Sequence, residues 1–109
     1  QVNIGDEEQK SGCPPEQLEQ LIRAVATLPN LRMRGLMCLP PHCDEAEQVR
    51  PYFQRMKELA AHIDQLQLPG VSMQELSMGM SDDFEVAVEE GATLVRIGTA
   101  IFGARMRKQ

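Results

Sequence analysis

Hydrophobic residues recur along the chain with two different periods, and each change of period marks a new element. Between Leu18 and Leu28 the apolar positions lie three or four residues apart, as on one face of a helix. The same spacing predicts a long helix over residues 45–66 and a shorter helix over residues 81–91. Compact apolar runs predict strands at residues 1–5, 31–39, 73–79 and 93–98.

Capping residues support the boundaries of the last helices. Ser81 is expected to be the N-cap of the helix that follows it, with Asp82 and Asp83 at the positive end of the helix dipole. Gly91 is expected to stop the same helix. Residues 99–105 then predict a short helical turn after the last strand.

Strands that alternate with helices at this spacing predict an α/β fold with a parallel sheet. Four strands are expected, joined by crossover helices. A closed eight-stranded barrel needs about 200 residues or more, and the chain has 109. The pattern therefore predicts either a small open sheet or the later half of a barrel, without a linker or a low-complexity segment.

Composition excludes several classes of partner. The formal net charge is −5 and the aromatic content is only 4%, without tryptophan. Basic residues form no stripe, apart from a short tail at Arg105, Arg107 and Lys108. These features argue against binding to nucleic acid or to an anionic membrane surface. No apolar run approaches the length of a membrane span.

The cysteines Cys13, Cys38 and Cys43 have no spacing typical of a disulfide framework. The segment "CLPPHC" brings two of them close to His42, but this ligand set is incomplete for zinc. We expect reduced thiols in a cytosolic protein and no metal site.

Two predicted strands end in residues suited to holding an anion. The third strand runs into Met80 and Ser81, and the fourth into Gly98 and Thr99, each before a predicted helix. Backbone N–H groups at a helix start favour an anion, and in parallel folds ligands bind at the carboxyl ends of the strands. Two neighbouring ends of this kind predict one phosphate site. The alternative is that Ser81 only caps a helix and Gly98 only allows a turn.

Arg96 lies on the last predicted strand, close to this site. Side chains alternate along a strand, so Arg96 points away from the face occupied by Val95 and Ile97. A buried guanidinium needs a partner. The partner is either an acid such as Glu75 or Asp82, or a bound ligand.

Three segments resemble one known family. "LSMGMSDDFEVAVEEGATLVRIGTAIFGAR" is similar to the C-terminal signature of the YggS/PROSC family of pyridoxal phosphate (PLP) homeostasis proteins, and "NIGDEEQKSG" and "LRMRGLMCLPP" resemble its mid-chain motifs. The resemblance spans residues 1–109. It implies the C-terminal half of an alanine-racemase-like (β/α)8 TIM barrel, with four parallel β-strands alternating with helices. It also implies a cytoplasmic PLP carrier or buffer without enzymatic activity.

The resemblance assigns roles to individual residues. The PLP phosphate would contact Ser81, the Met80 backbone, Gly98 and Thr99, with Ser77 on the same strand end as a weaker candidate. Arg96 would face the pyridine nitrogen, and a guanidinium there disfavours protonation of the ring. An unprotonated ring is a weaker electron sink, which suits a carrier better than a transaminase. Racemases of this fold use a similar arginine, so racemisation stays open on this point.

The chain departs from the family in one respect. The family's PLP lysine lies in the first half of the barrel, and neither Lys10, Lys57 nor Lys108 matches that position. PLP binding by this chain is therefore expected to be non-covalent at most. A half barrel also leaves two sheet edges without partners, so self-association or binding to a missing half is expected. The intact family proteins are described as monomers.

Two alternatives remain from the sequence. The first is a fragment of a PLP-dependent racemase-like enzyme, which would need a catalytic base. Tyr52 is the tyrosine of this chain, and its position in the apolar stripe of the long helix favours packing. The second alternative is a truncated or engineered half barrel without a ligand.

Overall fold

A parallel sheet organises the molecule. The computed structural model describes residues 1–104, which contain β1 (Met33–Met37), β2 (Val71–Met80) and β3 (Leu94–Arg96). The strands are parallel and lie side by side in the order β1-β2-β3, so β3 is an edge strand. Consecutive parallel neighbours with a helix in each crossover confirm the predicted α/β class.

The sheet of the described residues has three strands, and the strand expected at residues 1–5 is not among them. Val2 makes only isolated parallel bridges, to Cys13 and to Cys38. The ladder stops there because the backbone turns immediately afterwards. The side chain of Asn3 accepts a hydrogen bond from the Glu7 N–H at 3.0 Å and donates one to the Glu7 carbonyl at 2.7 Å, which holds residues 3–7 in a loop.

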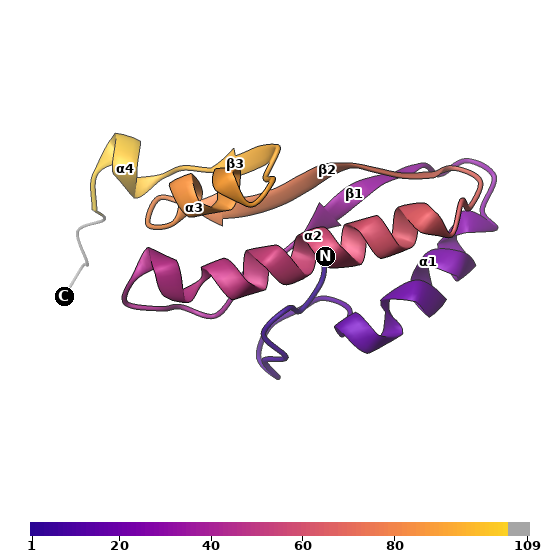
Figure 1. Ribbon diagram of the computed structural model, residues 1–109, viewed down its shortest axis with the longest axis horizontal. Helices are drawn as coiled ribbons and strands as arrows, with labels where there is room; N and C mark the ends of the chain where they lie inside the picture. Colours follow the sequence, from indigo (N-terminus) through magenta and orange to yellow (C-terminus); the bar gives the residue numbers. More distant parts are fainter. Residues whose placement is uncertain (105–109) are drawn as a thin grey trace.

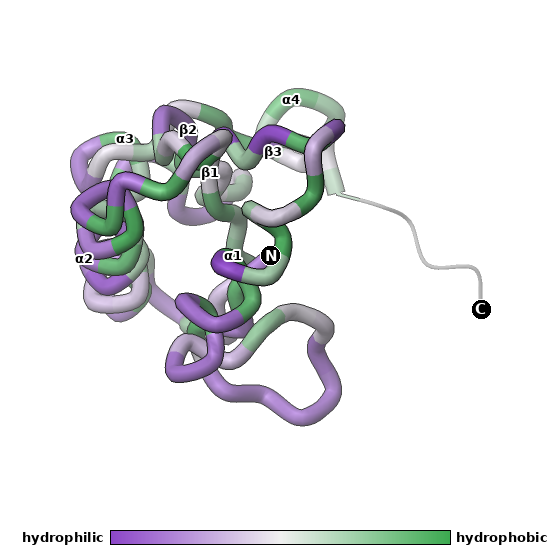
Figure 2. The backbone as a smooth tube through the Cα atoms, turned by 90° about the vertical axis from the view of Figure 1, so that its right-hand side faces the viewer, coloured by the Kyte–Doolittle hydropathy of each residue, from purple (hydrophilic) through white to green (hydrophobic). Residues whose placement is uncertain are grey.

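The helices follow the predicted positions. A 3₁₀ turn (η1, Pro15–Gln17) leads into α1 (Leu18–Ala26), and a second one (η2, Ala46–Gln48) leads into α2 (Arg50–Gln65). Pro51 lies in the first turn of α2, where a missing N–H costs nothing. The chain continues with α3 (Phe84–Glu89) and α4 (Thr99–Phe102). Figures 1 and 2 show α1 and α2 together on one side of the sheet.

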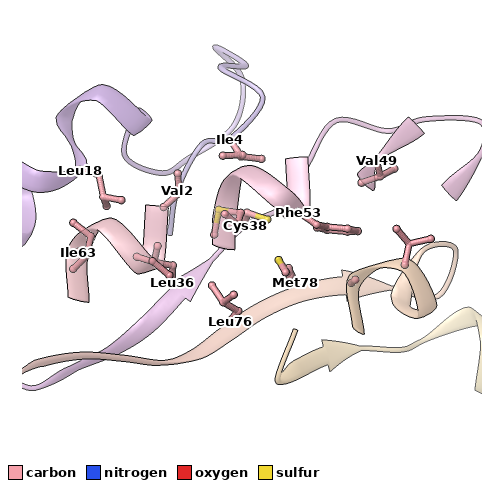
Figure 3. Close-up of a cluster of buried hydrophobic side chains, with 14 of the residues drawn as sticks. Val2, Ile4, Leu18, Leu36, Cys38, Val49, Phe53, Ile63, Leu76 and Met78 are labelled. Carbon is pink, nitrogen blue, oxygen red and sulfur yellow. The ribbon is translucent and has the colours of Figure 1, made fainter. Parts of the chain in front are cut away.

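The core lies between α2 and the sheet. Figure 3 shows Phe53 of α2 above Met78 of β2, while Ile63 near the other end of the helix approaches Leu36 of β1. The fully buried side chains include Phe53, Met56, Ile63 and Met78. Alternate residues of β2 supply this face, which explains why its burial alternates along the strand. Tyr52 is half-buried and packs against the same core, as the helical stripe predicts.

The predicted cap of α3 is wrong. The N-cap position is Asp83 and no side chain caps the helix. The Asp83 carboxylate accepts a hydrogen bond from the Met80 N–H at 2.7 Å, and this contact tightens the turn between β2 and α3. Ser81 lies two residues before this N-cap position. Gly91 follows the C-cap of α3 with φ +105°, which confirms its role as the stop.

The β3 edge of the sheet and the adjoining α4 expose apolar side chains. Leu94 of β3 and Ile101 and Phe102 of α4 are exposed, and α4 appears as a hydrophobic segment in Figure 2. Within residues 1–104, no helix has both the length and the hydropathy that crossing a membrane requires.

A candidate anion site at the carboxyl ends of the strands

One large cavity lies where the three strands end. Its volume is about 1360 Å³ and its wall includes residues that follow each strand. Leu39 and Pro40 come after β1, Met80 is the last residue of β2 with Ser81 directly after it, and the segment after β3 also contributes. The other lining residues are Lys10, His42, Cys43, Asp44, Ala46, Val49, Asp82, Asp83, Gly98, Thr99, Phe102, Gly103 and Ala104. Met80, Ser81, Gly98 and Thr99 thus all line this cavity.

Ser81 joins the two strand ends directly. Its Oγ accepts hydrogen bonds from the Gly98 N–H at 3.0 Å and from the Ala100 N–H at 3.1 Å. A hydroxyl oxygen that accepts two bonds still has its own O–H to donate. The amides at the start of α4 are thus engaged by Ser81, and the serine presents a fixed donor beside the cavity.

Two glycines of the site have different constraints. Gly79 has φ +105°, and a Cβ added there would lie 2.7 Å from the Cβ of Ala87. This glycine allows α3 to pack on β2. Gly98 has no heavy atom within 4 Å of such a Cβ, so the space above its backbone is open. A group that approaches this backbone therefore meets no side chain.

Arg96, the last residue of β3, is linked to the other two strands through backbone carbonyls. Its Nη2 donates to the Cys38 carbonyl at 2.9 Å and to the Ser77 carbonyl at 3.4 Å. In the described part of the chain no carboxylate forms an ion pair with it, so the alternative of a bridge to an acid such as Glu75 or Asp82 is not found. The acid is replaced by carbonyls because the carboxyl ends of parallel strands present their C=O groups together. Among residues 1–104, the buried Arg96 Nε has no hydrogen-bond partner.

Ser77 and Arg96 are not part of the cavity wall. Both are half-buried, and the Arg96 guanidinium donates to the Ser77 carbonyl. The predicted site residues thus form two groups. Met80, Ser81, Gly98 and Thr99 line the cavity, whereas Ser77 and Arg96 contact each other outside its lining.

Charged residues also line the cavity, and of these only Asp82 and Asp83 were assigned a role from the sequence, at a helix start. The Lys10 ammonium lies 2.8 Å from a Glu7 carboxylate oxygen and donates to the carbonyls of Leu39 and Pro40 at 3.1 and 2.9 Å. It fixes the segment after β1 against the loop of residues 3–12. The carboxylates of Asp44, Asp82 and Asp83 also line the cavity. The proline pair after β1 was the only sequence signal that this segment forms a wall.

The cysteines are free, and Cys38 is fully buried. Burial raises the pKa of the Cys38 thiol to about 12. It therefore acts as a small apolar core residue. Within residues 1–104, no cluster of three or more histidine, cysteine, aspartate or glutamate side chains has the geometry of a metal site.

The fold and the cavity define a class, that of parallel α/β domains with a ligand site at the carboxyl ends of the strands. The chain belongs to the family described as alanine racemase, N-terminal domain, whose model matches residues 1–106. Curated relatives share about half of its residues. The chain is 52% identical over 106 residues to the pyridoxal phosphate homeostasis protein of Aquifex aeolicus, and 49% identical over 105 residues to that of Escherichia coli. These names confirm the predicted resemblance.

The matches cover nearly all of this chain but only part of each relative. The alignments include 96% of this chain, and 45% and 44% of the two relatives. The structure of PipY from Synechococcus elongatus without PLP matches with a TM-score of 0.82 at 36% identity, over 94% of this chain and 47% of that chain. The PipY structure with PLP bound matches with a TM-score of 0.74 at 36% identity, over 87% and 44%. The relatives are named homeostasis proteins rather than enzymes.

Proposed function

We propose that this chain supplies the phosphate-binding side of a PLP site in a PLP homeostasis protein, a carrier or buffer of the cofactor. One observation carries the proposal: Ser81 fastens the end of β2 to the segment after β3, beside a cavity large enough for PLP. The relatives' names and the PipY structure with PLP bound support the choice of ligand.

The residues at the site fit a phosphate. Ser81 offers an O–H whose oxygen is held by two amides, and Thr99 offers a second hydroxyl on the same wall. The open space above Gly98 lets phosphate oxygens approach the backbone. Met80 contributes its backbone, and Ser77 remains a weaker candidate because it lies outside the cavity lining. Bonds from such donors to an anionic oxygen are stronger than those between neutral groups.

Arg96 is proposed to serve the pyridine ring of PLP. Its buried Nε has no partner among residues 1–104, so the guanidinium keeps a donor beyond the two strand carbonyls. A cation at the ring nitrogen opposes ring protonation. When bound, PLP supplies an electron sink for amino-acid chemistry, and this arrangement weakens that sink. We therefore propose a binding role without catalysis.

Binding by this chain alone is proposed to be non-covalent. Lys10 is the lysine on the cavity wall, and its ammonium is held by Glu7 and two carbonyls. Lys57 lies on α2 beside Gly91, and Lys108 falls outside the described residues. Racemase-like catalysis has no support from Tyr52, which packs against the core.

The chain is further proposed to be the later half of a closed (β/α)8 barrel in a cytoplasmic protein. Its coverage of 45% of the Aquifex relative supports this. The bridge of Val2 to Cys38 places the residues before η1 beside β1, where a fourth parallel strand of such a half barrel would lie. The remaining half would then cover the β3 edge.

The test is a PLP titration of the chain by isothermal calorimetry and absorbance, with pyridoxal, which lacks the phosphate, as the ligand control. We expect saturable binding of PLP only, without the absorbance change of a covalent lysine adduct. Ser81→Ala should weaken binding about tenfold, since a hydrogen bond to a charged group contributes about 1.5–3 kcal/mol. Ser11→Ala, which removes an exposed hydroxyl away from the cavity, is the matched control.

Two results would contradict the proposal. Equal affinity for PLP and pyridoxal would show that the phosphate is not recognised. Equal weakening by Ser81→Ala and Ser11→Ala would show that the Ser81 contact is not part of the site. Arg96→Ala, compared with Arg55→Ala on the exposed side of α2, tests the ring contact in the same assay.

A further inference from the structure

A second cavity lies at the opposite end of the strands. Its volume is about 410 Å³, and it is lined by residues at the amino ends of β1 and β2. Leu39 and Met80, which line the first cavity, lie at or beyond the carboxyl ends of the same strands. The lining residues are Arg32, Met33, Arg34, Gly70, Val71, Ser72 and Gln74. The family resemblance assigns no role to this end.

The charged groups of this cavity are both cations. Arg32 immediately precedes β1 and Arg34 is its second residue. Both are exposed, and neither forms an ion pair with any carboxylate in residues 1–104. By contrast, Arg23 and Arg50 pair with glutamates, in a chain whose net charge is −5. Two like charges in one cavity repel each other until an anion lies between them.

Neutral neighbours orient one of these guanidiniums. The Nη2 of Arg34 donates to the side-chain oxygen of Gln74 at 2.9 Å, which fixes the side chain without cancelling its charge. Ser72, two residues before Gln74 on β2, adds an exposed hydroxyl to the same wall. The ladder between β1 and β2 is irregular between Met33 and Gly35, at the level of this cavity.

Two carboxylates adjoin residues 72–74 of β2, and both have other contacts. Asp64 accepts a hydrogen bond from the Met73 N–H at 2.7 Å, and Glu75 accepts one from the Thr93 hydroxyl at 2.7 Å. Neither residue lines the cavity. An internal acid therefore does not neutralise the arginines.

We infer that Arg32 and Arg34 form a second anion-binding site, which takes a small phosphate-type dianion at the amino ends of the strands. Arginine suits this ligand because its planar guanidinium donates pairs of parallel hydrogen bonds to phosphate oxygens. Ser72 and the free donors of both guanidiniums surround the anion. This site is independent of the proposed PLP site.

The experiment is a titration of the ¹⁵N-labelled chain with inorganic phosphate, followed by amide chemical shifts, against sodium chloride at equal ionic strength. We expect saturable shifts centred on residues 70–74 with phosphate and not with chloride. The variant with both Arg32→Gln and Arg34→Gln should weaken this binding about tenfold or more. Arg55→Gln, an exposed arginine of α2 outside both cavities, should leave it unchanged within about twofold.

Each other outcome overturns the inference. Shifts that are absent, or that chloride reproduces, would show that the arginines hold no specific anion. Equal loss in the double variant and in Arg55→Gln would show attraction to surface charge in general. Arg34→Lys distinguishes loss of binding from loss of folding. Lysine keeps the charge but not the paired donors, so phosphate binding should fall while the circular dichroism spectrum stays unchanged. Ser81→Ala should leave these shifts intact, which separates this site from the PLP proposal.

Discussion

At the residue scale, the site depends on contacts of single small groups. One hydroxyl, that of Ser81, connects segments 17 residues apart along the chain. A donor placed by two backbone amides loses little freedom when it meets a ligand, and this pre-organisation favours binding. Arg96 has a similar connecting role, because its Nη2 donates to the Cys38 carbonyl after β1 and to the Ser77 carbonyl of β2.

The two glycines beside Ser81 should respond differently to alanine. Gly79→Ala should destabilise the chain by about 2–4 kcal/mol, because a Cβ at positive φ is strained and also collides with Ala87. Gly98→Ala should change stability by about 0.5 kcal/mol or less. It should still weaken PLP binding, since its methyl group enters the open space above the backbone.

Urea unfolding and PLP titration measure these two effects. If Gly98→Ala binds PLP as well as the unsubstituted chain, the phosphate does not approach that backbone. If Gly79→Ala is as stable as Gly98→Ala, the close packing of α3 on β2 is not required.

The Cys38 thiol should resist chemical modification. Its pKa of about 12 keeps it protonated at pH 8, and burial blocks access. A thiol reagent at this pH should modify Cys13 and Cys43 in the native chain, and Cys38 only after unfolding in guanidinium. Mass spectrometry of the labelled peptides gives the result, and rapid native labelling of Cys38 would contradict the described core.

At the element scale, α2 determines where α3 and the cavity wall lie. Arg50 at the start of α2 pairs with Glu47 at 2.8 Å, and with Glu89 and Glu90 at the end of α3 at 2.9 and 3.2 Å. A network around one partly buried arginine holds better than an isolated surface pair. It keeps α3, and with it the turn that carries Ser81, against α2.

Arg50→Gln should therefore lower the melting temperature more than Arg55→Gln, which removes an arginine of the same helix without an ion pair among the described residues. The Arg50 guanidinium lowers the pKa of Glu47 below 4.5. A lowered pKa in the folded state stabilises the fold at pH values above 4.5, and this contribution disappears as pH falls through the lowered pKa.

Melting curves of both variants at pH 7 and at pH 3 provide the test. The difference between Arg50→Gln and the unsubstituted chain should shrink at pH 3 and also in high salt. A difference that is the same at both pH values would mean that Arg50 stabilises through packing of its alkyl chain.

At the scale of the whole molecule, the open side of the sheet is the main feature. β3 is an edge strand, and Leu94 upon it is 52% exposed, while Phe102 of α4 is 83% exposed. An exposed apolar strand edge pairs readily with another chain. The chain spans 45% and 44% of the length of the two curated relatives. In a longer protein, a further segment would pack against the β3 edge.

We predict that the chain by itself self-associates through this edge. Light scattering coupled to size exclusion should give a mass that increases with concentration, and Leu94→Lys should shift it towards the monomer. Leu28→Lys is the matched control, since Leu28 is 48% exposed near the end of α1 and far from β3. A monomer at all concentrations, or an equal effect of both substitutions, would contradict this prediction.

The sequence by itself determined the order and type of the elements. Apolar residues at helical spacing located α1 and α2, and short apolar runs located the three strands, because these periods reflect one buried face of each element. It also placed Met80, Ser81, Gly98 and Thr99 at neighbouring strand ends, because parallel strands end at one edge of a sheet.

Only the tertiary structure decided which atoms meet. Capping rules made Ser81 a cap of α3, but the helix begins after Asp83, and the Ser81 hydroxyl accepts hydrogen bonds from the amides after β3. Arg96, for which an acid and a bound ligand were both considered, contacts backbone carbonyls instead of an acid. The run around Val2 forms isolated bridges because Asn3 bends the backbone. Each of these outcomes depends on contacts between segments, and the local pattern of hydrophobic and polar residues does not specify such contacts.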